Sequence, residues 1–133
     1  MRVETIDLNF LGTEKVIATF LLLGGNSAAI VETGPTSCLE HLQAGLKANG
    51  VSPEDVWEVL LTHIHLDHAG AAGKLVERWP DLEVWVHERG APHLADPSKL
   101  VASATRLYGE ANTFLDATYP KLDRVRTVTV RPR

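Results

Sequence analysis

The chain has 133 residues, of which 44% are hydrophobic and 23% are charged. These values are typical of a soluble globular protein, and the length suits one domain rather than two. The net charge of −4 lacks the basic excess of proteins that bind nucleic acids or acidic membranes. We therefore expect neither a nucleic acid nor a membrane as a partner.

The single cysteine, Cys38, excludes an intramolecular disulfide. We expect its side chain to be a small buried hydrophobe rather than a nucleophile or a metal ligand. The apolar run over 16–23 is too short to span a bilayer. It is preceded by Glu4, Asp7 and Glu14, whereas a signal peptide would be basic there. A cytoplasmic location is the resulting prediction.

Three strands are predicted in the first third of the chain. Residues 3–8 alternate between apolar and polar, which is typical of a half-buried strand. Residues 16–23 are almost wholly apolar, which predicts a strand covered on both faces. The turn signal at 24–27 would return the chain as a third strand over 28–32, ending at Thr33-Gly34-Pro35.

Helices and strands alternate in the rest of the chain. The pattern predicts an α/β fold. The expected elements are a helix over 37–48 opened by a Ser37–Glu40 capping box, one turn at 52–55, a strand over 56–62, a helix over 68–79 stopped by Pro80, a strand over 84–86, a helix over 98–109 and a strand at 127–130.

The segment Thr-His-Ile-His-Leu-Asp-His over 62–68 directly follows a predicted strand. In an extended chain, side chains alternate, so His63, His65 and Asp67 would project to one side, while His68 points elsewhere as the next helix begins. Imidazole and carboxylate ligands suit zinc, iron or manganese. Ligands of open α/β sheets gather beyond the carboxyl ends of strands. We therefore predict that this segment holds one or two metal ions.

A purely structural interpretation exists for each of these residues alone. Asp67 would serve as the N-cap of the following helix, and His63 would bond to backbone at the end of its strand. Three histidines and an aspartate within six residues favour the metal site over that interpretation.

The spacing from His63 to His68 resembles the His-x-His-x-Asp-His motif of the metallo-β-lactamase-fold hydrolases. Residues 32–35 (Glu-Thr-Gly-Pro) are similar to the strand-end Asp-Thr-Gly segment of that superfamily, and the small residues at 69–73 resemble the run that follows its motif. The resemblance implies the first half of an αββα sandwich, with a mixed sheet and helices on one face. Residues 1–133 would then be a single partial domain whose C-terminal half is missing.

The resemblance also implies roles for the motif. His63 and His65 would bind one metal ion, and Asp67 and His68 would bind a second. Asp67 would in addition be catalytic, orienting a metal-activated water or moving its proton. Glu32 would support a ligand histidine by accepting its ring N–H. The implied activity is zinc-dependent hydrolysis of a small ester, thioester or lactone-like substrate.

The further ligands of the family, in downstream Gly-His and Gly-Asp segments, are not found in this sequence. The alternative is therefore a truncated, non-catalytic domain that binds metal weakly or acts only with a partner chain. An uncovered sheet face would then favour a homodimer or a docked partner. The charge disfavours a nucleic-acid-processing relative, whereas a redox iron enzyme on the same scaffold stays open.

The remaining histidines and the tryptophans have weaker predictions. We expect His87 at the rim of the pocket, His93 at the surface or in helix packing, and His41 in solvent. Either His87 or His93 could replace a missing metal ligand. The tryptophans are expected in the core; they are Trp57, Trp79 and Trp85.

Overall fold

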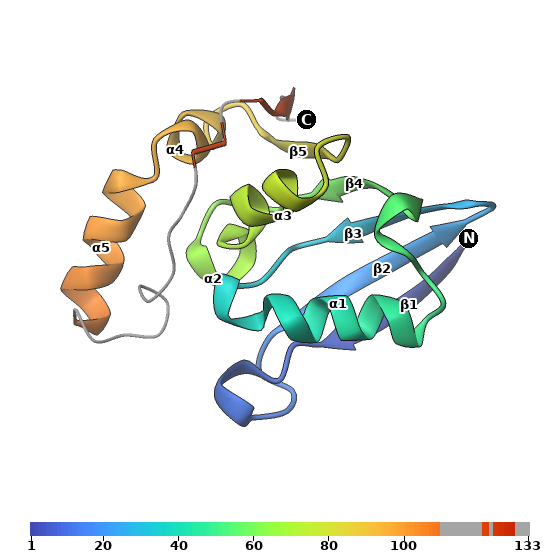
Figure 1. Cartoon of the computed structure of the whole chain (residues 1–133). Helices are drawn as coiled ribbons and strands as arrows, with labels where there is room; N and C mark the ends of the chain where they lie inside the picture. The colour runs from blue at the N-terminus through green and yellow to red at the C-terminus, as the bar shows by residue number, and fades with distance from the viewer. Residues whose placement is uncertain (110–120, 123, 130–133) are drawn as a thin grey trace, which may run out of the picture.

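A computed structural model describes residues 1–109, 121–122 and 124–129. Its centre is a six-stranded sheet whose strands lie side by side in chain order (Figure 1). The first two pairings are antiparallel and the other three are parallel, so the predicted mixed sheet is confirmed. The strands are β1 (Arg2–Asp7), β2 (Ala18–Gly24), β3 (Ser27–Val31), β4 (Val56–Leu60), β5 (Glu83–His87) and β6 (Arg126–Val128).

The helices α1 and α3 lie on one face of this sheet, and α5 stands beside α2 at the end where β3 and β4 finish (Figure 1). Among the described residues, no helix combines the length and the apolar character needed to cross a membrane. The helices are α1 (Leu39–Ala48), α2 (Leu66–Ala69), α3 (Ala72–Arg78), α4 (Ala91–Ala95) and α5 (Ser98–Tyr108), with 3₁₀ turns at Phe10–Gly12, Thr36–Cys38 and Pro53–Asp55.

The hydrophobic core lies between the sheet and these helices. Leu21, Ile30, Val59 and Val84 are register partners on β2 to β5, and each is at most 1% exposed. Leucines of α1 and α3 are buried in the same cluster. Full burial of such a side chain stabilises the fold by about 1.5–3 kcal/mol. The packing therefore fixes the strand ends from which the motif emerges.

The opposite face of the sheet has no helix against it in the described part of the chain. The next register row across the sheet includes Phe20, Val31, Leu60 and Trp85, and Phe20 is 43% exposed. The prediction that residues 16–23 are covered on both faces is therefore wrong. Trp57, predicted in the core, is 61% exposed. Apolar side chains of β2 point to both faces of the sheet, but the helices pack against one face only.

Local boundaries differ from the predictions where short turns intervene. The expected capping box at Ser37 does not form, because a 3₁₀ turn precedes α1 and makes Cys38 the N-cap. A capping box forms instead at the predicted turn, where Ser52 N–H donates to Asp55 Oδ2 at 3.0 Å. The last strand is seen as β6, while Val130 lies outside the described residues. Helix α4 was not predicted.

Cys38 itself is 1% exposed and carries a free thiol, as predicted. Burial raises the pKa of this thiol. The side chain therefore contributes to packing.

Candidate metal centre

Two neighbouring strands deliver the candidate site. β3 and β4 are parallel, and both end at the same edge of the sheet. Just beyond that edge Glu32 N–H donates to the Leu60 carbonyl at 3.0 Å, and Leu61 N–H donates to the Trp85 carbonyl at 2.9 Å. The strand pairing thus continues past the formal strand ends and holds Glu32 next to the loop that carries His63.

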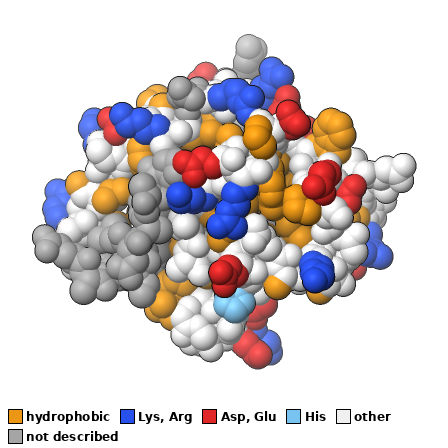
Figure 2. All heavy atoms as spheres, in the orientation of Figure 1, with side chains coloured by type: hydrophobic (Ala, Val, Ile, Leu, Met, Phe, Trp, Pro, Cys, Tyr) orange, Lys and Arg blue, Asp and Glu red, His pale blue; other side chains and the backbone are white. Residues whose placement is uncertain are grey.

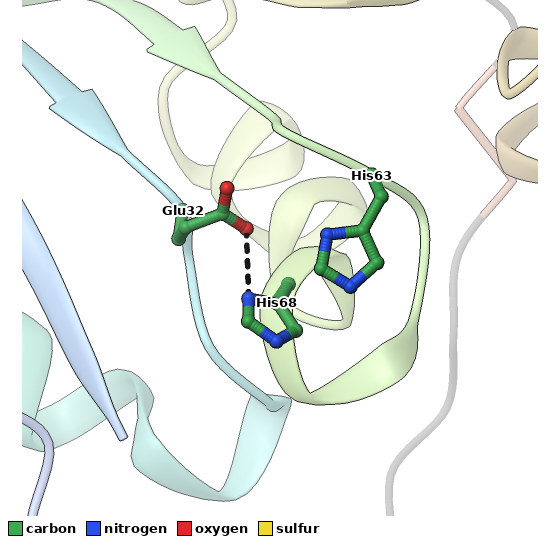
Figure 3. A group of neighbouring side chains, drawn as sticks. All are labelled: Glu32, His63 and His68. Atoms are coloured by element: carbon green, nitrogen blue, oxygen red, sulfur yellow. Dashed lines mark ion pairs between the residues drawn. The ribbon is translucent and has the colours of Figure 1, made fainter.

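Glu32 is the buried acid of the site. It is 5% exposed, and its φ of 69° lies in the left-handed region, which costs a non-glycine residue about 1–3 kcal/mol. Its Oε1 accepts the Thr62 N–H at 2.8 Å, and its Oε2 lies 3.2 Å from His68 Nδ1 (Figure 3). The second contact has ion-pair distance without hydrogen-bond geometry, so Oε2 is otherwise unsatisfied. Backbone strain together with a buried oxygen that lacks a hydrogen bond makes Glu32 a candidate functional residue.

Three imidazoles gather in front of Glu32. The His63 ring centroid lies 4.1 Å from that of His68 and 4.8 Å from that of His65. Potential ligand atoms of Glu32, His63 and His68 all lie within 4.8 Å of one another. Asp67 joins the group through its Oδ2, which lies 3.3 Å from His68 Nε2.

This arrangement corrects the predicted directions of the side chains. Helix α2 begins at Leu66 with His65 as its N-cap, so Asp67 lies inside the helix and not in an extended segment. Asp67 is therefore not the N-cap of the structural interpretation. His68, expected to point away, instead faces His63 and Glu32, because one helical turn brings it back over the end of β3.

The backbone of His68 is fixed by the loop after β3. Its carbonyl oxygen accepts hydrogen bonds from Thr33 N at 2.7 Å, Gly34 N at 3.1 Å and Thr33 Oγ1 at 3.0 Å. Ala71 N–H then donates to the Gly34 carbonyl at 3.0 Å instead of continuing the helix. The single helix predicted over 68–79 is therefore two helices, α2 and α3, with a break where the loop crosses.

The break also explains the small residues that follow the motif. A Cβ on Gly70 would collide with the Leu66 carbonyl oxygen and would meet Pro35 at 3.2 Å. Ala71 and Ala72 are at most 1% exposed. The loop after β3 can therefore approach closely only because this run has almost no side chains.

The protonation of His63 suits metal binding. Burial, followed by the neighbouring His68 imidazole, lowers the pKa of His63. Its Nδ1 lies 2.8 Å from Thr62 Oγ1. A lowered pKa keeps the imidazole neutral at neutral pH, and the neutral ring is the form that binds a metal ion.

Comparison with known proteins agrees with the resemblance of the motif. A sequence profile described as the Metallo-beta-lactamase superfamily matches residues 12–131. The chain belongs to this superfamily. The resemblance seen in the motif is thereby confirmed for most of the chain.

Two curated proteins match part of the sequence. A hydroxyacylglutathione hydrolase of Xanthomonas euvesicatoria pv. vesicatoria is 38% identical over 65 residues, which are 49% of this chain and 23% of that protein. The probable metallo-hydrolase YqgX of Bacillus subtilis is 40% identical over 53 residues, 40% of this chain and 23% of that protein. The matches thus span about a quarter of each relative.

Solved structures of the superfamily share the fold. The di-zinc class B3 metallo-beta-lactamase LRA-12, from an Alaskan soil metagenome, has a TM-score of 0.69 at 20% identity, covering 96% of this chain and 42% of that chain. The subclass B3 enzyme BJP-1 of Bradyrhizobium japonicum has a TM-score of 0.63 at 20% identity, covering 85% and 39%. The predicted α/β class and metallo-β-lactamase-type fold are confirmed.

The residues present fit a metal ion of the zinc type. The donor set is three imidazoles and carboxylates without a thiolate, which suits zinc, iron or manganese. Glu32 Oε2, buried beside His68 Nδ1, lies where a carboxylate steadies the far side of a ligand imidazole. The superfamily motif thus lies in a group of side chains that could hold a metal ion.

The other predicted histidines lie apart from this group. His87 ends β5, and its Nδ1 accepts the Arg89 N–H at 3.1 Å. His93 is half-buried in α4, and His41 is exposed on α1, as expected. The rim position of His87 stays a prediction.

Sequence reasoning missed Thr33 and Thr62, which bond the backbone and ring of motif residues. Only their positions beside Glu32 and His63 in the sequence could have signalled this role.

Proposed function

We propose that the chain supplies the metal-binding motif of a metal-dependent hydrolase. His63 and His65 would hold one ion, and Asp67 with His68 would hold a second. A bound zinc ion lowers the pKa of its water to about 7 and so supplies hydroxide at neutral pH. The convergence of Glu32, His63 and His68 at the ends of two parallel strands is the observation that carries the proposal.

The side chains have distinct tasks in this proposal. Glu32 favours the His68 tautomer that has its proton on Nδ1, which leaves Nε2 free as a ligand. Asp67, whose carboxylate already faces His68 Nε2, orients the water and accepts its proton. Hydrolysis of an ester adds one water and releases an acid and an alcohol, so no further reactant is required.

The proposed substrate is a small ester, thioester or lactone. The relative named hydroxyacylglutathione hydrolase acts on a thioester, which supports this class. The net charge of −4 offers no attraction for a nucleic acid. A cytoplasmic location remains a prediction.

The alternative is a non-catalytic domain that binds metal weakly and acts with a partner chain. It is favoured by the open sheet face, where Phe20 and Trp57 are exposed. It also agrees with the partial coverage of the relatives, since the chain matches 42% or less of the solved structures given above. Either a second copy or another chain would cover that face.

Metal content and hydrolysis decide between the two. The purified chain is equilibrated with zinc, manganese or iron(II), desalted, and analysed for metal. The hydrolase proposal expects about one or more ions per chain and hydrolysis of p-nitrophenyl acetate or a thioester. Less than about a tenth of an ion per chain, with no hydrolysis, would contradict it. Retention of iron with no hydrolysis would favour a redox enzyme.

Matched histidine variants test the ligand assignment. His63→Ala and His65→Ala should each abolish metal binding, because two of the few ligands lie there. His41→Ala, exposed on α1, should bind metal like the wild type. Loss of binding in His41→Ala would refute the assignment.

A further inference from the structure

A cavity of about 320 Å³ lies beside the metal motif. On one side it is bounded by α2 and its N-cap, and on the other by α5. Its position brings it against His65 and Asp67, two of the four proposed ligands. The lining residues are His65, Leu66, Asp67, Leu100, Ser103, Ala104 and Leu107.

The wall on α5 is one face of an amphipathic helix. Leu100, Ser103, Ala104 and Leu107 are spaced i, i+3, i+4 and i+7, so their side chains share a face. The first three are half-buried, whereas Leu107 is 77% exposed although it lines the cavity. The apolar face of α5 is therefore turned toward the motif rather than into the core.

The cavity has one polar end and one apolar end. His65 and Asp67 form the polar end, while Leu66, Leu100 and Leu107 supply hydrocarbon. The volume is at the lower end of small-molecule sites. A ligand that matches this lining has a polar carbonyl group joined to an aliphatic chain of a few carbons.

We propose that this cavity binds the aliphatic acyl chain of an ester or thioester substrate and places its carbonyl group at the motif. The inference rests on the proposed hydrolase function and narrows its substrate class. Leu100 and Leu107 on α5 would then determine which chain lengths are accepted. Between these two leucines on α5 lies Ser103, whose hydroxyl oxygen accepts a hydrogen bond from Arg106 Nη2 at 3.2 Å.

Binding of the acid products tests the cavity without requiring turnover. Acetate, butyrate and hexanoate are titrated into the isotopically labelled chain, with and without added zinc, and their affinities are followed by NMR. Each methylene buried in the cavity should tighten binding about fourfold, so hexanoate should bind about fifteenfold tighter than butyrate. Shifts should concentrate at the methyl groups of Leu66, Leu100 and Leu107.

Three variants locate the preference. Leu107→Ala should reduce the ratio of hexanoate to butyrate affinity severalfold, and Ser103→Phe, which fills the cavity, should abolish it. Leu11→Ala is the matched control, because Leu11 is 64% exposed and lies outside the cavity. It should retain the wild-type ratio.

The outcomes separate the inference from the proposed function. A chain-length preference that Leu107→Ala weakens and Leu11→Ala keeps supports the cavity, even if no ester is hydrolysed; only the hydrolase proposal would then fail. Equal affinities across the series, no hexanoate binding, or a preference unchanged in Leu107→Ala and Ser103→Phe would overturn the inference, even in an active hydrolase.

Discussion

Replacing Glu32 by glutamine should weaken metal binding more than it weakens the fold. Glutamine has the same shape and keeps one oxygen that can accept the Thr62 N–H, now 2.8 Å from Glu32 Oε1. Its amide nitrogen would then face His68 Nδ1, in place of the carboxylate oxygen at 3.2 Å. Because that nitrogen can only donate, it favours the His68 tautomer with its proton on Nε2.

The two effects have different sizes. A hydrogen bond to a charged acceptor contributes about 1.5–3 kcal/mol and one to a neutral acceptor about 0.5–1.5 kcal/mol. The bond from Thr62 should therefore weaken by about 1 kcal/mol. A proton on Nε2 must leave before that nitrogen can bind a metal ion, and loss of such a supporting carboxylate typically lowers affinity about 10- to 100-fold. That range corresponds to about 1.4–2.7 kcal/mol of binding free energy.

Competition with a chromophoric chelator measures zinc affinity, and urea denaturation of the metal-free chain measures the free energy of unfolding. Glu58→Gln is the matched control, because Glu58 is a half-buried glutamate of β4 outside the metal-binding group. It should retain wild-type zinc affinity. If Glu32→Gln binds zinc as tightly as the wild type, Glu32 does not set the His68 tautomer and the reasoning fails.

Three further predictions concern the fold. Gly45→Ala should destabilise the chain by about 1–3 kcal/mol in urea denaturation, because the new Cβ would collide with Ile6; a gain in stability, as helix propensity alone predicts, would refute this packing. The backbone N–H groups of Asn9 and Lys15 lower the pKa of Asp7 from 3.8. The ionised Asp7 side chain therefore stabilises the fold above pH 3.8, and this stabilisation is lost as the pH falls through the folded pKa. On acidification, the urea midpoint of Asp7→Asn should fall less than that of the wild type. The buried Cys38 thiol, whose pKa burial raises, should react with Ellman's reagent only after denaturation, and fast reaction of the folded chain would contradict its burial.

The sequence predicts the elements well where periodicity is strong and less well where neighbours decide. β1 and α5 follow the predicted ranges within two residues, since their patterns match one secondary structure only. The break between α2 and α3 has no local signal, because it depends on the Ala71 N–H finding the Gly34 carbonyl across the fold. The exposure of Trp57 also has no local signal, because Trp57 is the extra residue at the register shift where Ala28 pairs with Val56 and Ala29 with Glu58.

In the candidate site, too, the sequence predicts some features, and others depend on the fold. The residue types of the motif predict metal chemistry because three imidazoles and a carboxylate so close in sequence have few other uses. Their directions were predicted wrongly at Asp67 and His68, since strand alternation was extended into residues that are helical. Family resemblance suggested that Glu32 would lie near a ligand histidine without saying which one. The structure places it beside His68, because β3 packs next to β4.

In the loop after β3, the strained backbone of Glu32 and the contacts of its side chain have opposite effects on stability. The left-handed φ of Glu32 costs about 1–3 kcal/mol, a conformation that glycine would adopt without strain. Only a glutamate there offers one oxygen to the Thr62 N–H and another to His68, and the charged bond to Thr62 alone contributes about 1.5–3 kcal/mol. The bond to Thr62 thus offsets the strain, while the other oxygen of the same carboxylate faces His68, a ligand in the proposed site. The two residues that follow Glu32 bind the motif as well: the N–H groups of Thr33 and Gly34 and the Thr33 hydroxyl all donate to the His68 carbonyl oxygen. These hydrogen bonds hold the loop after β3 against the backbone of the motif.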